Sequence, residues 1–526
     1  MAVQNRRDQV LAYRFLLRRR HAALLAGDPD SSEAPLRKLG TATFGSIMAA
    51  TLIAAGAGIM GVLSPGHDSS WKTSNAIIVE KETGSRFIYD PNPAPAGSPP
   101  ALHPVLNYAS ARLLLKESGW HSISVSRKSL AGFPRAADVG IVGAPDELPG
   151  PGGVTPGPWT VCALPGLDAK GAARSLTQLS VGTAPAGAAS PIGQQALVVQ
   201  VADNAGARRA APDNTASGGK GYWLVWNGRR YQIGDASSGA PADDPATVLS
   251  ALTYQTNAAL PVSAAWLDTL PTGTPLRLPK LPDGPIPAEM TVGGKVAAPG
   301  QLFVVQARNG VPDRWFVATS KGFVELNQVQ FELLGLQHGA PTAQAFADDM
   351  NRKVGDSSLI STGDGTWPTR SPTIANSSTS GPQAVCAATT PGKPDIAIST
   401  RAADPAQTQA SCYRLAPPAQ AQTAVGADCV SLAPGTAAVA RSQANTGVAA
   451  PTYLVTGNGE YVAKDSLGPD PAGTLKALGL EAAPVAEVPQ PLLALLPDGP
   501  TLSAELARLA VVPPAPGPSP TTAAGS

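Results

Sequence analysis

The sequence predicts an α+β protein with one N-terminal transmembrane helix and a β-rich part outside the membrane. Three observations carry this prediction. An uncharged run of 23 residues occupies positions 41–63, patterns typical of β-hairpins recur four times after it, and all four cysteines follow it. We expect the outer part to be a central β domain flanked by four degenerate modules, each built from a hairpin and a helix.

Residues 41–63 predict the membrane span. As a helix with a rise of about 1.5 Å per residue, this segment covers roughly 35 Å, more than a hydrocarbon core of about 30 Å. Eight Lys and Arg precede it within residues 1–40, whereas the ten residues after it contain only Lys72. This bias predicts a cytoplasmic N-terminus and an extracytoplasmic C-terminal part in the cell membrane. A cleaved signal peptide would be shorter and closer to the start, so a retained signal-anchor is favoured.

Residues 1–40 predict a cytoplasmic amphipathic helix and a linker. Val10, Tyr13, Leu17 and Leu24 recur at the spacing of one helical face. Four arginines lie beside that face, at positions 14, 18, 19 and 20. Three interpretations remain open: contact with anionic lipid headgroups, docking on a cytoplasmic partner, or a solvated cluster of charges that only sets the topology.

Four hairpin modules are predicted after the span. Strand–turn–strand patterns occur at 77–89, 222–233 and 453–462, with a longer variant at 303–324. A Leu-Pro-x-Gly motif follows at 270–273 and at 496–499, with Val and Leu residues upstream of it at identical offsets. Residues 281–284 resemble it again. Accidental similarity between Val-rich strands is the alternative, and repeats of this kind seldom imply chemistry.

The segments between the modules predict a central β domain in two halves, with modules 2 and 3 inserted between them. Strand-like segments lie at 159–162, 196–201, 384–386 and 395–399. The expected boundaries, in chain order, are a cytoplasmic helix and linker at 1–40, the transmembrane helix at 41–63, module 1 at 70–128, the first central half at 129–216, module 2 at 217–290, module 3 at 291–345, the second central half at 346–449, module 4 at 450–511 and a disordered tail at 512–526.

The cysteines predict two disulfides, because their number is even and all four lie on the side expected to be oxidising. They are Cys162, Cys386, Cys412 and Cys429. Three pairings are possible, and the sequence alone does not choose among them. With the central domain in two halves, a Cys162–Cys386 bond would join the halves, and a Cys412–Cys429 bond would close a local loop of about 16 residues. The spacings are not C-x-x-C, which disfavours a zinc or thiol redox site.

No catalytic, cofactor-binding or metal-binding residue is predicted, and a non-enzymatic role is favoured. The balance of 39 Lys and Arg against 38 Asp and Glu gives no general attraction to nucleic acid. Gly-Lys pairs end at Lys220, Lys295 and Lys393, but each lacks the following Ser or Thr and the first glycine of a phosphate-binding loop. The five histidines do not pair at metal-ligand spacing, and no G-x-S-x-G motif occurs.

Several of these segments together resemble the EccB family, core membrane components of the actinobacterial type VII (ESX) secretion system. The resemblance covers residues 6–511 and includes the N-terminal run 9–19, the single span and Ile88-Tyr89. The most specific piece runs from His103 to Leu113, His-Pro-Val-Leu-Asn-x-x-Ser-Ala-Arg-Leu. Cys162 and Cys386 match the disulfide positions of the family's central domain, whereas Cys412 and Cys429 are an addition.

The resemblance implies a membrane-anchored scaffold subunit of the secretion core complex, with an outer part that associates with itself. It also implies partners of the EccC, EccD and EccE types, contact with lipid and no nucleic acid. Family members are often labelled ATPases, a label that the missing phosphate loop does not support. Two alternatives remain: an extracytoplasmic nucleotide hydrolase, which substitution of Lys220, Lys295 and Lys393 would test, and a cell-wall-binding module.

Overall fold

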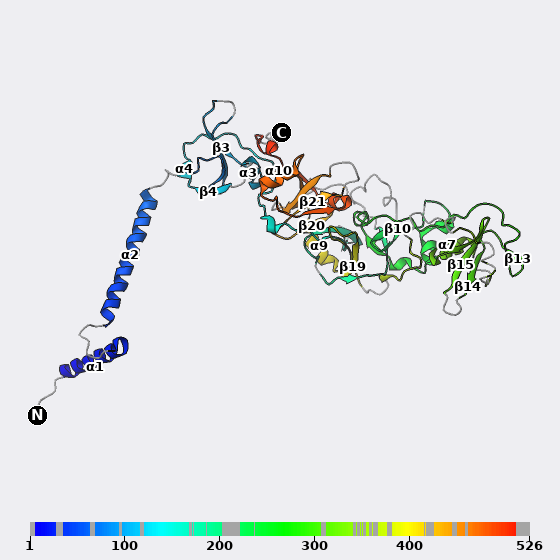
Figure 1. Cartoon of the computed structure of the whole chain (residues 1–526), viewed down its shortest axis with the longest axis horizontal. Coiled ribbons are helices and arrows are strands. Elements are labelled where there is room, and N and C mark those ends of the chain that lie inside the picture. Colours follow the sequence, from blue (N-terminus) through cyan, green and yellow to red (C-terminus); the bar gives the residue numbers. More distant parts are fainter. Residues whose placement is uncertain are drawn as a thin grey trace, which may run out of the picture. The chain divides into compact units, whose positions relative to one another are not determined.

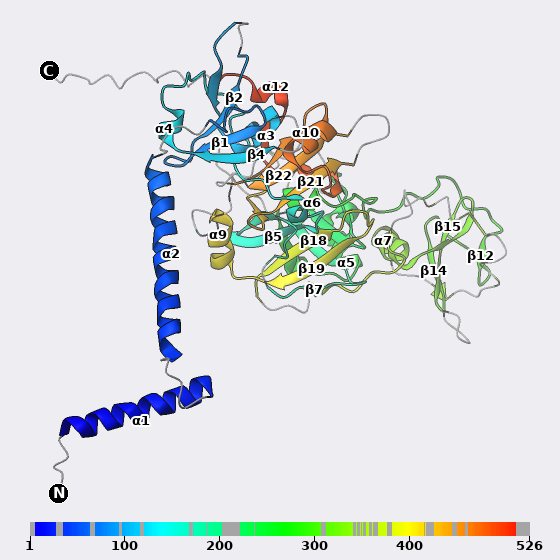
Figure 2. The same cartoon turned by 60° about the vertical axis from the view of Figure 1, so that its left-hand side comes forward.

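The structure of the protein is a computed structural model. It describes residues 6–511 except 28–34, 64–68, 94–96, 116–119, 168–170, 172, 186, 202–220, 236, 307–311, 340–342, 345–347, 349, 351–353, 357–359, 361–366, 376–380, 415, 417–425, 444–449 and 458–460. At 25–26, 35–40, 56–63, 343–344 and 413–414 it describes the main chain but not the side chains. The tail predicted at 512–526 lies outside these residues. The chain forms two compact units: residues 1–102 with 121–135, and residues 103–120 with 136–526 (Figures 1 and 2).

The described residues of the first unit form two long helices, one short helix and a four-stranded sheet. The long helices are α1 (Arg6–Ala26) and α2 (Pro35–Leu63), and α2 includes the whole segment 41–63. The sheet has the order β3-β2-β1-β4, with β1 at Ala76–Glu80, β2 at Arg86–Asp90, β3 at Ala101–Pro104 and β4 at His121–Val125. The short helix α4 (Arg127–Leu130) follows β4. The core of this sheet contains the buried residues Trp71, Ile78, Phe87 and Val125, as the apolar hairpin pattern predicts.

The central sheet combines strands that precede the second module in the sequence with strands that follow the third. Its order is β20-β6-β5-β18-β19-β7, with β5 at Trp159–Leu167, β6 at Ala173–Val181, β7 at Ser190–Pro191, β18 at Gln383–Thr389, β19 at Ile396–Ala402 and β20 at Cys429–Leu432. Helix α9 (Pro405–Arg414) packs on β5 and β20. Strands that are more than 200 residues apart in sequence therefore pair directly, as the two-halves interpretation predicted.

The second and third modules each contain a four-stranded sheet and one main helix. The second has the order β10-β9-β8-β11 and consists of β8 (Leu197–Val201), β9 (Tyr222–Trp226), β10 (Arg229–Ile233), α5 (Pro245–Ala251), β11 (Leu260–Val262) and α6 (Ala264–Leu267). The third has the order β16-β15-β14-β17 and consists of the ribbon β12 (Thr291–Val292) and β13 (Lys295–Val296), then β14 (Leu302–Val305), β15 (Arg314–Thr319), β16 (Gly322–Leu326), α7 (Gln328–His338) and β17 (Ala343–Gln344).

The fourth module has a five-stranded sheet of order β24-β21-β22-β23-β25. Its elements are β21 (Ala437–Ser442), β22 (Thr452–Gly457), β23 (Val462–Ser466), α10 (Pro471–Leu478), β24 (Val485–Val488), α11 (Gln490–Ala494), β25 (Asp498–Thr501) and α12 (Ala504–Ala507). Helix α3 (Tyr108–Leu115) belongs to the second unit and packs on α10 and α12. Short 3-10 helices lie at η1 (Pro151–Gly153), η2 (Pro241–Asp243) and η3 (Thr256–Ala258).

All four modules share one topology, which differs from the predicted hairpins. Three consecutive strands lie side by side, a helix follows along the chain, and a fourth strand pairs parallel with the first. The pattern at 77–89 is the first and second strands of its module, whereas those at 222–233 and 453–462 are the second and third. The missing first strands are β8 and β21. The expected boundaries placed both in the central domain, which is wrong.

A fifth segment returns beside the third strand in every module. Parallel bridges join Leu102 to Arg135, Arg230 to Thr272, Phe323 to Val354 and Lys464 to Asp498. The two matched Leu-Pro-x-Gly motifs occupy this position, because the amide of Arg230 donates to the carbonyl of Pro271 and that of Lys464 to Pro497, both at 3.0 Å. Their offsets therefore reflect a real repeat. Residues 281–284 are not equivalent, since Asp283 instead accepts a hydrogen bond from Ser320 Oγ of the third module.

Modules 2 and 4 share one hydrophobic core with the central sheet. Val161 and Leu179 of the central strands pack with Val199 and Trp223 of the second module and with Val455 of the fourth. The indole of Trp266 on α6 donates a hydrogen bond to the carbonyl of Val161 at 3.1 Å. The four cysteines belong to a separate buried cluster with Leu164, Leu176 and Ala384. This arrangement confirms a mixed α+β fold.

Candidate functional site

Helix α2 exposes large apolar side chains along its described length. Every described side chain from 41 to 55 is exposed, and Phe44, Ile47, Leu52 and Ile53 keep 64–73% of their surface. Within the first unit, no described segment therefore covers residues 41–55 of the helix. Within the described residues, no helix combines the length and the apolar character that crossing a membrane requires.

Helix α1 forms where a helix was predicted, but its apolar side chains do not occupy a single face. Tyr13 and Leu24 of the predicted row are 65% and 83% exposed. Leu11 and Phe15, which lie off that row, are also more than half exposed. The six arginines are spread along and around the helix. The amphipathic character is therefore weaker than predicted, because apolar and basic residues alternate around the helix.

The most specific sequence motif, residues 103–113, forms the entry to α3 and the helix itself. Asn107 Oδ1 accepts a hydrogen bond from the amide of Ser110 at 3.0 Å, and its Nδ2 donates to the carbonyl of Ile141 at 2.7 Å. Ser110 Oγ accepts from the amide of Ile141 at 2.9 Å. These buried polar groups fix the start of α3 to the loop at 139–141. Their partners are all within the protein, so they are structural.

Arg112 connects α3 to the fourth module. Its guanidinium lies 4.0 Å from the ring centre of Trp120, and the side chain is buried. Its terminal nitrogen would lie only 2.6 Å from a Cβ at Gly479, which ends α10 in a left-handed conformation. The carbonyl end of a helix attracts a cation. The motif therefore joins residues 103–120 to α10, and Leu113 and Leu478 share the same core.

An exposed apolar patch lies beside this joint. We define the apolar patch as Leu106, Val142, Leu506 and Leu509, which are 42%, 71%, 39% and 59% exposed. Main-chain bonds bring its parts together: the amide of Leu106 donates to Val139, which pairs antiparallel with Ala510. The sequence did not reveal this surface, because its members come from segments almost 400 residues apart.

Two disulfides are present, as the even number of cysteines predicted, and the structure selects one of the three possible pairings. Cys162 on β5 and Cys386 on β18 face each other across the strand pair, with a Cα–Cα distance of 4.1 Å. This bond joins the two halves of the central sheet. Cys412 on α9 bonds to Cys429 on β20 and closes the local loop. All four cysteines are buried.

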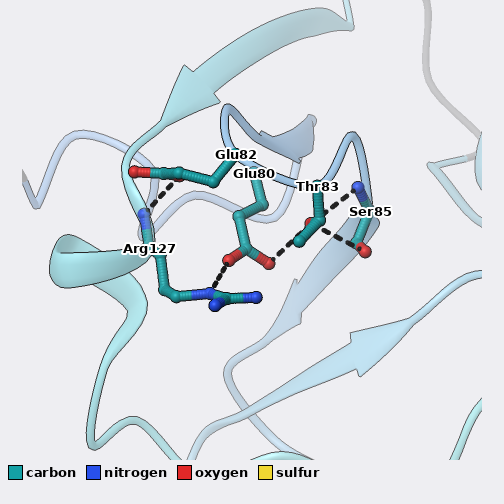
Figure 3. Close-up of polar contacts among 5 residues, drawn as sticks. All are labelled: Glu80, Glu82, Thr83, Ser85 and Arg127. Carbon is teal, nitrogen blue, oxygen red and sulfur yellow. Dashed lines mark hydrogen bonds and ion pairs between the residues drawn. The ribbon is translucent and has the colours of Figure 1, made fainter.

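A buried carboxylate organises one end of the first unit's sheet (Figure 3). Glu80 Oε1 accepts from Arg127 Nε at 2.6 Å, and Oε2 accepts from Thr83 Oγ1 at 2.9 Å. The bond from Arg127 holds the pKa of Glu80 below its usual range. Glu82 accepts from the amide of Arg127 at 2.8 Å. The network ties the turn after β1 to the start of α4.

A second buried carboxyl, Asp465, has no such cationic partner among the residues that the structure describes. Burial raises its pKa to about 8. It lies on β23 against Gly499, where a Cβ would be 1.8 Å from Oδ1. Tyr231 and Val324 hold the corresponding position in the second and third modules, against Gly273 and Gly355. An acidic group in the fourth module thus occupies a position that a tyrosine and a valine fill in these two modules.

The two Gly-Lys lysines that the structure describes, Lys295 and Lys393, lie in different parts of the fold. Lys295 begins β13 after the Gly293-Gly294 turn, and Lys393 lies in the turn between β18 and β19. Both are exposed, while Lys220 lies outside the described residues. In the part of the chain that the structure describes, no group of three or more His, Cys, Asp or Glu side chains is placed to hold a metal ion.

Comparison with known proteins identifies a family match over almost the whole chain. The family described as "Type VII secretion system ESX-1, transport TM domain B" matches residues 3–514. The ESX-3 secretion system ATPase EccB3 of Mycobacterium tuberculosis is 27% identical over 302 residues, or 56% of this chain. This chain therefore spans about half (48%) of that relative's length. The ESX-2 secretion system ATPase EccB2 of the same species is 26% identical over 473 residues, 87% of this chain and 86% of the relative.

Two solved structures share the fold. A chain of an intact ESX-5 inner membrane complex aligns with a TM-score of 0.61 at 23% identity, covering 99% of this chain and 98% of the other. The EccB3 dimer from the ESX-3 core complex aligns with a TM-score of 0.57 at 23% identity, covering 83% of this chain and 100% of the other.

Proposed function

Because the chain belongs to the EccB family of type VII secretion systems, we propose that it is a membrane-anchored scaffold subunit of a type VII secretion core complex. The family match over residues 3–514 is the observation that carries this proposal. The buried, internally satisfied polar groups of the 103–113 motif support a structural rather than a catalytic role. The outer part pairs with a second copy, and the helical N-terminal part holds it at the membrane.

Helix α2 is the anchor in this proposal. Its 29 residues correspond to about 44 Å of helix, enough to cross a hydrocarbon core of about 30 Å with some tilt. The uncharged segment 41–63 and the exposed side chains of Phe44 and Leu52 support a lipid environment. The eight Lys and Arg before it place the N-terminus in the cytoplasm and modules 1–4 outside, as a retained signal-anchor.

The apolar patch is the surface that pairs with a second copy. Exposed apolar side chains such as Leu506 and Leu509 favour burial against a partner, and contiguous patches of this kind mark interaction sites. A relative of this fold is known as the EccB3 dimer from the ESX-3 core complex. The occupant we propose is therefore the same patch of another chain, in a symmetric contact.

The remaining partners are membrane proteins of the EccC, EccD and EccE types. The support is that the relative of this fold comes from an intact ESX-5 inner membrane complex. Relatives carry the word ATPase in their names. We assign ATP hydrolysis to a separate subunit with a phosphate-binding loop, because no Gly-Lys pair of this chain has the flanking residues of one.

Purification of the tagged full-length protein from its native membrane in mild detergent tests the proposal. We expect a large assembly that contains multi-span proteins and a separate ATPase with a phosphate-binding loop. Recovery of this chain alone, in a detergent that preserves other complexes of that membrane, would contradict the scaffold role and favour an independent function facing the cell wall.

The self-association surface has its own test. The double variant Leu506→Ser/Leu509→Ser should shift the full-length protein in detergent from dimer to monomer, measured by light scattering. Val296→Ser/Val354→Ser is the matched control, because those valines of the third module are 55% and 62% exposed and lie outside the patch. A dimer that survives the leucine changes, with an unchanged melting temperature, would place the contact elsewhere.

A further inference from the structure

Charge is distributed unevenly along this almost neutral chain. Residues 1–135 contain 16 Lys and Arg against 9 Asp and Glu, whereas residues 136–526 contain 23 against 29. The first unit and the N-terminal segments are therefore basic, and the remainder is acidic. Unequal charge between the parts of a chain points to a surface with an oppositely charged partner.

The sheet portion of the first unit holds much of the positive charge. Residues 69–102 and 121–135 contain six Lys and Arg against three acids. One of the acids, Glu80, is buried and bonded to Arg127. We define the basic surface by its exposed cations: Lys72, Lys81, Arg127, Lys128 and Arg135.

Three cations of the basic surface, Lys81, Arg127 and Lys128, gather where β1 and β4 end. Lys81 follows the last residue of β1, and its amide donates to the carbonyl of Val125, the last residue of β4, at 2.9 Å. Arg127 and Lys128 come two and three residues after Val125. The strand ends therefore hold Lys81 close to the first turn of α4, as Figure 3 shows for the neighbouring Glu80 and Arg127.

Glu80 and Phe87 hold the two arginines of the basic surface in place. Glu80 accepts a hydrogen bond from Arg127 Nε, and the guanidinium of Arg135 lies 4.8 Å from the ring centre of Phe87. Arg127 nevertheless keeps 64% of its side chain exposed. A buried carboxylate and an aromatic ring thus order guanidinium groups that still face solvent. Little conformational entropy remains to be lost when an anion binds to them.

The chain between α2 and this sheet is short. Only residues 64–68 separate Leu63, the end of α2, from Ser69. Six residue steps of at most about 3.6 Å reach no further than about 22 Å. If α2 crosses a bilayer, as the proposed function requires, the sheet starts close to the lipid headgroups. Electrostatic attraction acts over about 10 Å at 0.1 M salt. The short linker allows the basic surface to come within that distance of the headgroups.

We propose that the basic surface binds the anionic phospholipid headgroups of the membrane that α2 crosses. The inference rests on the proposed function, because it needs α2 in the bilayer. The chemistry is that of phosphodiester anions with guanidinium and ammonium groups, in which Arg127 and Arg135 supply fixed donors and the lysines supply mobile charge. The contact would set the first module down on the membrane surface.

Lysine reactivity tests this contact on the full-length protein. The chain is reconstituted in nanodiscs of phosphatidylcholine alone or of phosphatidylcholine with phosphatidylglycerol, and acylation by an amine-reactive ester is followed by mass spectrometry. We expect Lys81 and Lys128 to react about fivefold more slowly on the anionic bilayer at low salt, and equally on both at 0.5 M NaCl. Lys295, at the start of β13, and Lys393, in the turn between β18 and β19, are exposed residues of the second unit and serve as internal controls.

A lysine substitution tests whether the protection of Lys128 depends on the charge of the basic surface or only on steric shielding by the bilayer. Lys81→Gln should weaken binding to the anionic bilayer by about fivefold and so reduce the protection of Lys128, whereas Lys393→Gln should leave it unchanged. Equal reactivity on both bilayers, with α2 still resistant to protease, would overturn the inference and leave the anchor intact. Failure of α2 to insert would instead count against the proposed function. Protection by a soluble polyanion on neutral nanodiscs, but not by anionic lipid, would also overturn it.

Discussion

At the scale of one residue, Asp465 differs in chemistry from the residues at the equivalent position of the second and third modules. The third strand of each module places one side chain beneath the fifth segment, and the second and third modules use Tyr231 and Val324 there. Asp465 fills the same space with a carboxyl group whose pKa burial raises to about 8. It is therefore mostly uncharged at neutral pH, since the protonated form avoids the cost of burying a charge.

This carboxyl predicts a pH dependence of stability. Its pKa is about 8 in the folded protein, against about 3.9 in an unfolded chain. Between these values the folded state binds the extra proton, so the free energy of unfolding falls as the pH rises, by up to about 1.4 kcal/mol per pH unit. Asp465→Asn should remove this slope and raise the melting temperature more at pH 8 than at pH 5.

The exposed Glu481→Gln is the matched control for this experiment. It should leave the pH dependence of the melting temperature unchanged. The same gain for Asp465→Asn at pH 5 and pH 8 would show that Asp465 does not titrate in this range.

Arg112 is the second residue whose contacts predict a measurable change in the free energy of unfolding. Its guanidinium stacks on Trp120 and reaches the carbonyl end of α10 from α3. Arg112→Ala should lower the free energy of unfolding by about 1–3 kcal/mol, because it removes the cation–π contact and the buried stem together. Arg112→Lys should recover only part of the loss, since an ammonium lacks the planar face. Melting curves measure both, and the exposed Arg508→Ala should change little.

At the scale of one element, the fifth segment of each module depends on a close backbone approach. A Cβ at Gly499 would lie 1.8 Å from Asp465, and one at Gly273 would lie 2.2 Å from Tyr231. Gly499→Ala and Gly273→Ala should therefore each lower the free energy of unfolding by about 1–3 kcal/mol through overpacking. Gly457→Ala, with no atom within 4 Å of its Cβ, should be tolerated. Equal effects in all three variants would show that the approach is relaxed in solution.

The disulfides differ in the length of chain that they constrain. Cys412 and Cys429 are separated by 17 residues, and Cys162 and Cys386 by 224. In the chain-entropy account, their loss should lower the free energy of unfolding by about 3 and about 5 kcal/mol respectively. Paired Cys→Ser variants, compared by denaturant unfolding, measure the two values. A greater loss for the short loop would mean that local packing in the cysteine cluster outweighs loop entropy.

Sequence patterns predicted the local elements better than their pairing. The offsets of Leu270-Pro271 and Leu496-Pro497 identified equivalent segments. In each, the proline carbonyl accepts a hydrogen bond from a main-chain amide of the third strand, and the glycine leaves space for a side chain of that strand. The strands β8 and β21 were assigned to the wrong domain. Their buried runs carry no mark of which sheet they join, and in modules 2 and 4 long connections separate them from the strands they pair with.

At the scale of the whole molecule, the long apolar helix was visible in the sequence and the proposed association surface was not. The uncharged run 41–63 is a continuous signal, and it lies within α2, which begins earlier, at Pro35, and ends at Leu63 as expected. The apolar patch combines Leu106 with Leu506 and Leu509, which are ordinary leucines until main-chain pairing at Val139 and Ala510 places them together. Surfaces made from distant segments depend on tertiary contacts that no local pattern encodes.

The last prediction concerns the activity suggested by the names of the relatives. If this chain hydrolysed ATP through a Gly-Lys loop, replacing that lysine would abolish turnover, because the lysine neutralises the transferred phosphate. Lys295 lies instead at the exposed start of β13 in the third module, and Lys393 lies in an exposed turn of the central sheet. Lys220→Ala, Lys295→Ala and Lys393→Ala should each leave the ATPase rate of the purified assembly unchanged. Loss of more than about tenfold in one variant, with the assembly intact, would make this chain a hydrolase and reverse the scaffold assignment.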